Sequence, residues 1–78
     1  MINEFLEELR ACATTAGAEN VKHFNNARRL WMQFPPDLQL WVINKIDNIY
    51  ILKILLGLGT RGKAWIALIS KINELQKK

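Results

Sequence analysis

The architecture depends most on one apolar stretch, PPDLQLWVINKIDNIYILKILLGLG, residues 35–59. Its first half carries apolar side chains every three or four positions, at Leu38, Trp41, Val42 and Ile46. This spacing predicts one face of an amphipathic helix. The pattern then loses its phase near Asp47 and Asn48, and apolar residues occupy nearly every position from Ile49 to Leu58.

Two interpretations of this stretch remain open. It forms either one long helix that is buried almost all round, or two helices with a break at Asp47 and Asn48. Because both residues favour helix caps over helix interiors, we expect a break, with one of them capping a short fourth helix. The β-branched run Ile49–Ile51 also fits a strand, but the sequence holds no second strand pattern with which it could pair.

Two helices are predicted before this stretch. The first has an apolar face formed by Ile2, Phe5, Leu6, Leu9 and Ala13. Gly17 is suited to end it in the left-handed conformation. The second has its own stripe, consisting of Val21, Phe24, Ala27, Trp31 and Phe34. It should stop at Pro35, and Pro36 or Asp37 suits the first turn of the next helix.

A last helix is predicted after the glycines, with Thr60 as its N-cap. Its core face comprises Trp65, Leu68, Ile69, Ile72 and Leu75. Since Trp31, Trp41 and Trp65 each lie on an apolar stripe, we expect all three to pack in the core. A chain of 78 residues suits one small core. The predicted fold is therefore all-α: a single helical domain, residues 1–78, built as a compact bundle of four to five short helices.

The central helices carry more apolar surface than the flanking helices of so small a chain are expected to cover. This excess predicts a homo-oligomer, most simply a symmetric dimer, or a groove that receives a helix of a partner. The expected interface residues are Tyr50, Ile51, Ile54 and Leu58.

Charge is divided unevenly along the chain, whose formal net charge is +4. Residues 1–20 carry a net charge of −3 and residues 21–78 a net charge of +7. Two interpretations are open: the acidic first helix neutralises basic neighbours in the fold or in a dimer, or the basic remainder of the chain presents a positive face to an acidic partner. No signal peptide is visible and the apolar stretch contains too many polar residues to span a bilayer, so we expect a cytoplasmic protein without membrane insertion.

The segment GLGTRGKA, residues 57–64, matches two nucleotide-binding patterns, G-x-G-x-x-G and most of a phosphate loop. The first pattern requires parallel strands that the sequence lacks, and the second requires a hydroxyl at the position of Ala64. We therefore interpret the glycines as a helix connection. Its amides, with Arg61 and Lys63, remain a simple candidate anion site.

The same segment allows a helix-turn-helix, with residues 49–58 as the supporting helix and the last helix in the DNA major groove. Positive side chains that could contact nucleic acid are Lys22, Arg28, Arg29, Arg61 and Lys63. Against this interpretation, Ile66 and Ala67 would lie near the reading face, and side chains that read base edges are scarce.

Catalysis and metal binding are not expected. The sequence has one serine, Ser70, one histidine, His23, and one cysteine, Cys12, and they share no catalytic spacing. Cys12 cannot form an internal disulfide and is expected to be a buried apolar residue. No metal site and no cofactor are therefore predicted.

The sequence thus favours a small non-enzymatic binding protein that acts as an inhibitor, adaptor or regulator through a protein–protein surface. Analogy of size alone suggests an accessory factor of a phage or plasmid. The alternative is a DNA- or RNA-binding helical domain that uses the five basic residues. A membrane-active helix cluster is the least favoured interpretation, because the first helix is acidic.

Overall fold

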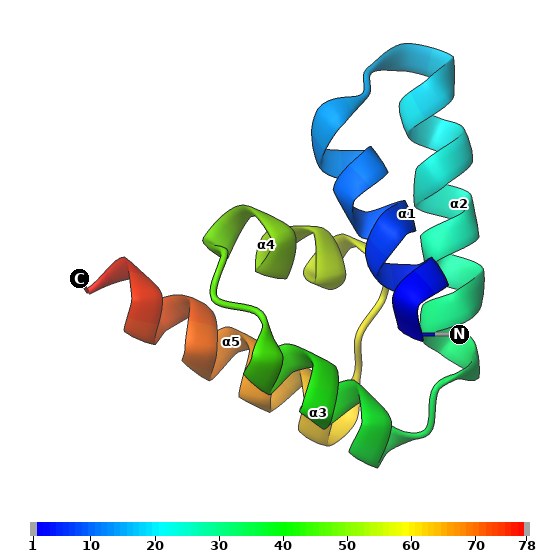
Figure 1. Cartoon of the computed structure of the whole chain (residues 1–78). Helices are drawn as coiled ribbons and strands as arrows, with labels where there is room; N and C mark the ends of the chain where they lie inside the picture. Colours follow the sequence, from blue (N-terminus) through cyan, green and yellow to red (C-terminus); the bar gives the residue numbers. More distant parts are fainter. Residues whose placement is uncertain (1, 78) are drawn as a thin grey trace.

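A computed structural model describes residues 2–77, and this part of the chain is entirely helical apart from short connections. Figure 1 shows the order and arrangement of the elements. The helices are α1 (Ile2–Thr14), α2 (Gly17–Gln33), α3 (Pro36–Lys45), α4 (Ile49–Gly57) and α5 (Gly62–Gln76). The predicted all-α class is confirmed, and of the four to five helices expected, residues 2–77 form five.

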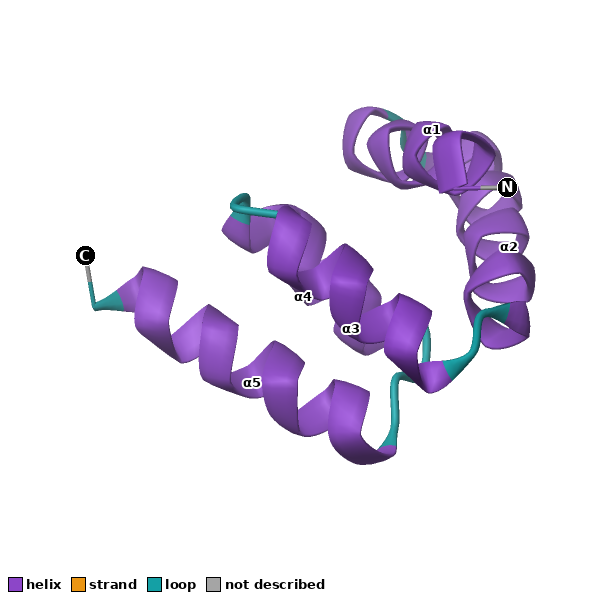
Figure 2. Cartoon of the chain, turned by 60° about the horizontal axis from the view of Figure 1, so that its bottom comes forward, coloured by secondary structure: helices purple, strands orange, loops and turns teal. Residues whose placement is uncertain are grey.

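The helices form two groups. Helices α1 and α2 make an antiparallel hairpin that lies to one side of the other three (Figure 1). In the second group, α3 and α4 both pack against α5, as Figure 2 also shows. Helix α4 joins the groups, because it contacts α1 as well as α5. The core therefore lies around α4.

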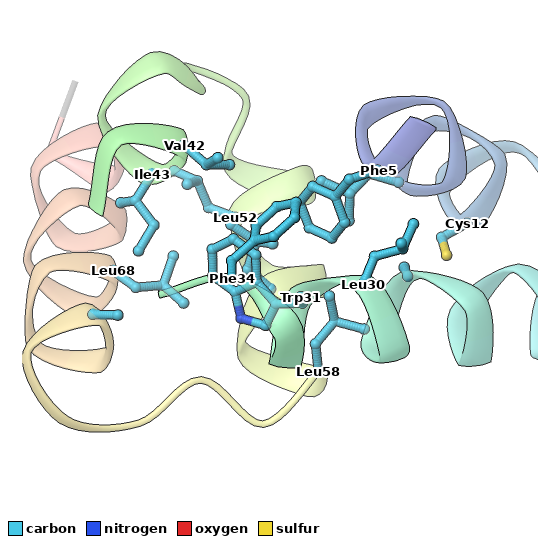
Figure 3. Close-up of a cluster of buried hydrophobic side chains, with 14 of the residues drawn as sticks. Phe5, Cys12, Leu30, Trp31, Phe34, Val42, Ile43, Leu52, Leu58 and Leu68 are labelled. Atoms are coloured by element: carbon cyan, nitrogen blue, oxygen red, sulfur yellow. The ribbon is translucent and has the colours of Figure 1, made fainter. Parts of the chain in front are cut away.

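An aromatic cluster occupies the meeting point of the two groups (Figure 3). The rings of Phe5 and Trp31 stack with their centroids 5.1 Å apart, and Phe34 meets Phe5 edge-on at 5.2 Å. Such pairs add stabilisation beyond the area that they bury. The aliphatic part of the core comes from all five helices and includes Leu9, Leu30, Val42, Ile43, Leu52, Leu55, Leu58, Leu68 and Ile72.

The predicted break in the central stretch is confirmed. Helix α3 ends at Lys45, and α4 begins after Asn48, whose Oδ1 accepts hydrogen bonds from the backbone N–H groups of Tyr50 at 2.9 Å and Ile51 at 3.2 Å. These bonds satisfy two amides that the helix cannot pair internally. The corner at Pro35 and Pro36 is confirmed as well, with Pro36 as the first residue of α3.

The prediction that Thr60 caps the last helix is wrong. The cap position belongs to Arg61, and the Thr60 side chain is buried. Its hydroxyl accepts a hydrogen bond from Trp31 Nε1 at 2.8 Å and donates one to the Leu55 carbonyl at 2.7 Å. A buried indole N–H needs an acceptor, and the hydroxyl supplies it while it also binds the end of α4.

Two of the three tryptophans lie elsewhere than expected. Trp31 is fully buried, but Trp41 is 48% exposed and Trp65 is 47% exposed. Val21, expected on the apolar stripe of the second helix, is also exposed, and Leu30 takes a core position instead. The hydrophobic faces of α2, α3 and α5 are therefore wider than the neighbours that cover them.

Glycine supplies the backbone conformations that the connections require. Gly17 has φ +65° and Gly59 has φ +93°, both in the left-handed region that side chains disfavour. The left-handed geometry expected at Gly17 is thus confirmed, but Gly17 does not end the first helix: α1 stops at Thr14 and Gly17 is the first residue of α2. Within residues 2–77, every helix is too short or too polar to cross a membrane.

Candidate protein-binding groove

An apolar groove with a volume of about 270 Å³ lies between α1 and α3. Ile2, Leu6 and Arg10 follow one another every four residues along α1, so they line one wall. Its remaining lining residues are Leu9 from α1, Trp41, Val42 and Lys45 from α3, Ile46 from the α3–α4 connection and Ile51 from α4.

The groove exists because its two walls pack on different supports. Helix α1 packs on α2 and α4, whereas α3 packs on α5. The first turn of α4, which carries Ile51, lies between the walls. Each wall is therefore held by a helix behind it, and the space between them does not need to close for the core to form. A preformed concave site of this kind lowers the ordering cost of binding.

Apolar side chains in the groove remain accessible. Ile2, Leu6, Ile46 and Ile51 are half-buried, and Trp41 is about half exposed. Apolar surface gathered in a concave site, as opposed to scattered singly, is typical of a binding region. Trp41 in particular belongs to the residue types that contribute most binding energy at protein interfaces.

Two cations lie at the edges of the groove, one on each wall. Arg10 belongs to α1 and Lys45 to α3, and both are exposed. The Lys45 ammonium lies 5.7 Å from the centroid of the Trp41 ring, which is a cation–π arrangement. Within the described part of the chain, the ion pairs involve His23 and Lys71 and neither of these two cations. Both charges are therefore available to an anionic group.

The residues expected at an oligomer interface separate into different environments. Tyr50 is 73% exposed, Ile51 lines the groove, and Ile54 is half-buried against the core. The prediction that Leu58 lies at an oligomer interface is wrong, because this side chain is only 1% exposed and is covered by the chain itself. Leu52 and Leu55 are also fully buried, so the flanking helices cover this part of the central segment.

The five candidate basic residues are all exposed. Lys22, Arg28 and Arg29 lie on α2, while Arg61 and Lys63 lie at the start of α5. Arg28 is held at the end of α4, where Nη2 lies 3.5 Å from the Gly57 carbonyl oxygen and the guanidinium is 5.4 Å from the Phe24 ring centroid. The structure thereby places Arg28 beside the glycine-containing connection that leads to Arg61.

The histidine and the cysteine have structural environments. His23 Nδ1 lies 2.7 Å from Glu8 Oε2, and Nε2 lies 3.3 Å from Glu19 Oε2, so the ring connects α2 to α1. Cys12 is buried, and burial, reinforced by the charge of Glu8, raises the pKa of its thiol above the ordinary value. Residues 2–77 contain no cluster of histidine, cysteine and carboxylate side chains that could hold a metal ion.

Sequence reasoning missed the groove itself. In the sequence, Arg10 is a single opposing charge on an acidic helix, and Trp41 lies on an apolar stripe that is expected in the core. The available pattern was the four-residue spacing of Ile2, Leu6 and Arg10, which places a cation at the end of an apolar row. Its significance depends on α3 lying across from that row, which no local pattern shows.

Comparisons with known proteins add no information on function, so the function is argued from the geometry of the groove. No protein-family model, curated protein or solved structure matches the chain.

Proposed function

We propose that this protein is a small non-enzymatic binding protein, acting as an inhibitor, adaptor or regulator, and that the groove between α1 and α3 is its contact surface for another protein. The observation that carries the proposal is the accessible apolar lining around Trp41, held open by two separately supported helices. A groove of this size suits one or two inserted side chains, and such anchors dominate the energetics of many protein interfaces.

The other side chains of chemical interest support a binding role over catalysis. His23 is engaged by two carboxylates, and Cys12 is buried with a raised thiol pKa, which disfavours the reactive thiolate. Ser70 is exposed on α5, whereas His23 belongs to the α1–α2 hairpin, so different helix groups carry them.

The nucleic-acid alternative has less support. Helices α4 and α5 run antiparallel, one returning alongside the other (Figures 1 and 2), whereas the two helices of a helix-turn-helix cross steeply. Trp65 and Ile66 are exposed near the start of α5, where a reading helix would need polar side chains.

A photo-crosslinking experiment tests the proposed surface. Trp41 is replaced by benzoylphenylalanine in the organism that encodes the protein, and adducts are identified by mass spectrometry. The control places the same group at Met32, which is exposed on α2 outside the groove. We expect one defined protein adduct from position 41 that is absent from position 32 and is lost when Leu6→Glu puts a charge into the apolar wall. Nucleic-acid adducts, or the same adducts at both positions, would contradict the proposal.

A further inference from the structure

The lining of the groove indicates the chemistry of its occupant. We infer that the groove receives an acidic amphipathic helix of a partner protein, an inference that rests on the proposed function of the groove as a protein-binding surface. In this arrangement one or two apolar side chains enter beside Trp41, and carboxylates on the two sides of the apolar stripe meet Arg10 and Lys45.

The shape of the groove points to a helix. The α1 wall extends from Ile2 to Arg10, a rise of about 12 Å or roughly two helical turns. Two turns present apolar residues four positions apart on one face, which matches the repeat of the wall. The volume of about 270 Å³ lies just below the usual range for ligand pockets, so it suits inserted side chains more than an enclosed small molecule.

The charges point to an acidic occupant. Arg10 and Lys45 stand on opposite walls, and an apolar segment bound between them with carboxylates on both sides would neutralise both. The net charge of +4 of the whole chain attracts an acidic partner at long range. A second copy of this chain carries the same net charge of +4, so the long-range interaction opposes self-association.

A matched set of fluorescent peptides tests the inference. The acidic peptide is a 16-residue helix with leucines four positions apart and glutamates on both sides of the stripe. One twin replaces every glutamate by lysine, and another replaces the leucines by serine. Anisotropy titrations at low salt should show the acidic peptide binding about tenfold more tightly than either twin. The difference from the lysine twin should narrow as salt rises, because it is electrostatic, whereas the difference from the serine twin should persist.

Two double variants separate the groove from overall charge. Arg10→Glu with Lys45→Glu reverses the two groove cations, while Arg29→Glu with Lys53→Glu reverses two exposed cations outside the lining. Both pairs lower the formal net charge from +4 to zero. The groove pair should abolish or invert the preference for the acidic peptide, and the control pair should keep most of it. Circular dichroism confirms that each variant is folded.

Several outcomes would overturn the inference: acidic and basic peptides binding equally, neither binding, or both double variants losing the preference to the same extent. Light scattering that shows a dimer whose groove is closed to peptide would assign the surface to a second copy. If the cross-link at position 41 captures a defined protein while the peptides show no acidic preference, the inference fails and the proposed function stands. If no protein is captured, the proposed function itself fails.

Discussion

The ammonium of Lys71 lies at the C-terminal end of α3, although Lys71 itself belongs to α5. Its Nζ donates to the carbonyl oxygens of Ile43 and Asn44, both at 2.8 Å, and lies 3.4 Å from Asp47 Oδ1. The last carbonyls of a helix have no partner within the helix, and a cation is favoured there by the helix dipole. One side chain thus joins α5 to the end of α3.

Replacing Lys71 by methionine should lower the free energy of unfolding by about 1–2 kcal/mol, because the apolar stem is retained while the charged hydrogen bonds are lost. Urea denaturation followed by circular dichroism measures the change. The matched control is Lys53→Met, at an exposed position on α4, which should change stability by about 0.5 kcal/mol or less. Equal midpoints for the two variants would show that the contacts contribute nothing.

Cys12 should react slowly in the folded protein. Burial and the neighbouring charge of Glu8 raise its thiol pKa, so little thiolate is present at neutral pH. Alkylation by iodoacetamide at pH 7.5 is therefore expected to be much slower than in urea. Equal rates would contradict the buried position.

The same shift has a consequence for stability. Above the thiol pKa of the unfolded chain, the unfolded state loses a proton that the folded state retains. This contribution to stability is therefore complete below that pKa and falls as pH rises through and beyond it. Denaturation midpoints of the natural protein should decline relative to those of Cys12→Ala from about pH 8.5 upward.

At the scale of elements, Asn48 lies at the break that divides the central apolar stretch into α3 and α4. Its side chain caps α4, and Ile46–Asn48 turns the chain so that α4 runs back along α5 (Figure 1). Local composition was enough to predict this break, because Asp47 and Asn48, which both favour helix caps, stand where the apolar pattern loses its phase. The N-cap of α5 could not be predicted in the same way, because the Thr60 hydroxyl accepts a hydrogen bond from Trp31, a residue distant in sequence.

Asn48→Ala should cost about 1 kcal/mol of stability, since two N–H groups at the start of α4 lose their acceptor. Asn48→Asp keeps a capping oxygen and should retain most of the stability. Thermal denaturation of the two variants side by side measures the difference. If both lose the same amount, the side-chain oxygen is not what caps the helix.

At the scale of the whole molecule, Phe5 anchors the aromatic cluster that fastens α1 to α2 within the shared core. It is fully buried, stacks on Trp31 and meets Phe34, and it belongs to the helix that contacts α4. Phe5→Ala removes this aromatic contact and leaves a cavity at the junction. The expected loss is about 3–5 kcal/mol, a large part of the roughly 4–12 kcal/mol that a chain of this length supports.

Chemical denaturation of Phe5→Ala tests this expectation, and Phe5→Leu is the milder comparison that keeps most of the apolar volume. Phe5→Leu should stay folded at room temperature and lose less stability than Phe5→Ala. A Phe5→Ala variant as stable as the natural protein would show that the contacts of Phe5 with Trp31 and Phe34 contribute little to stability.

Local patterns were sufficient for the helical class, the proline corner, the central break and the burial of Cys12, because periodicity, caps and backbone restrictions act within a few residues. They were insufficient for the groove and for the fate of Trp41, Trp65 and Leu58. Each of these residues lies on an apolar face, and whether such a face is covered depends on which helix packs across from it. The packing of α4 between α1 and α5 decides which faces are covered. This packing buries Leu58. Because α1 and α3 then pack on different helices, Trp41 stays exposed beside Arg10 and Lys45.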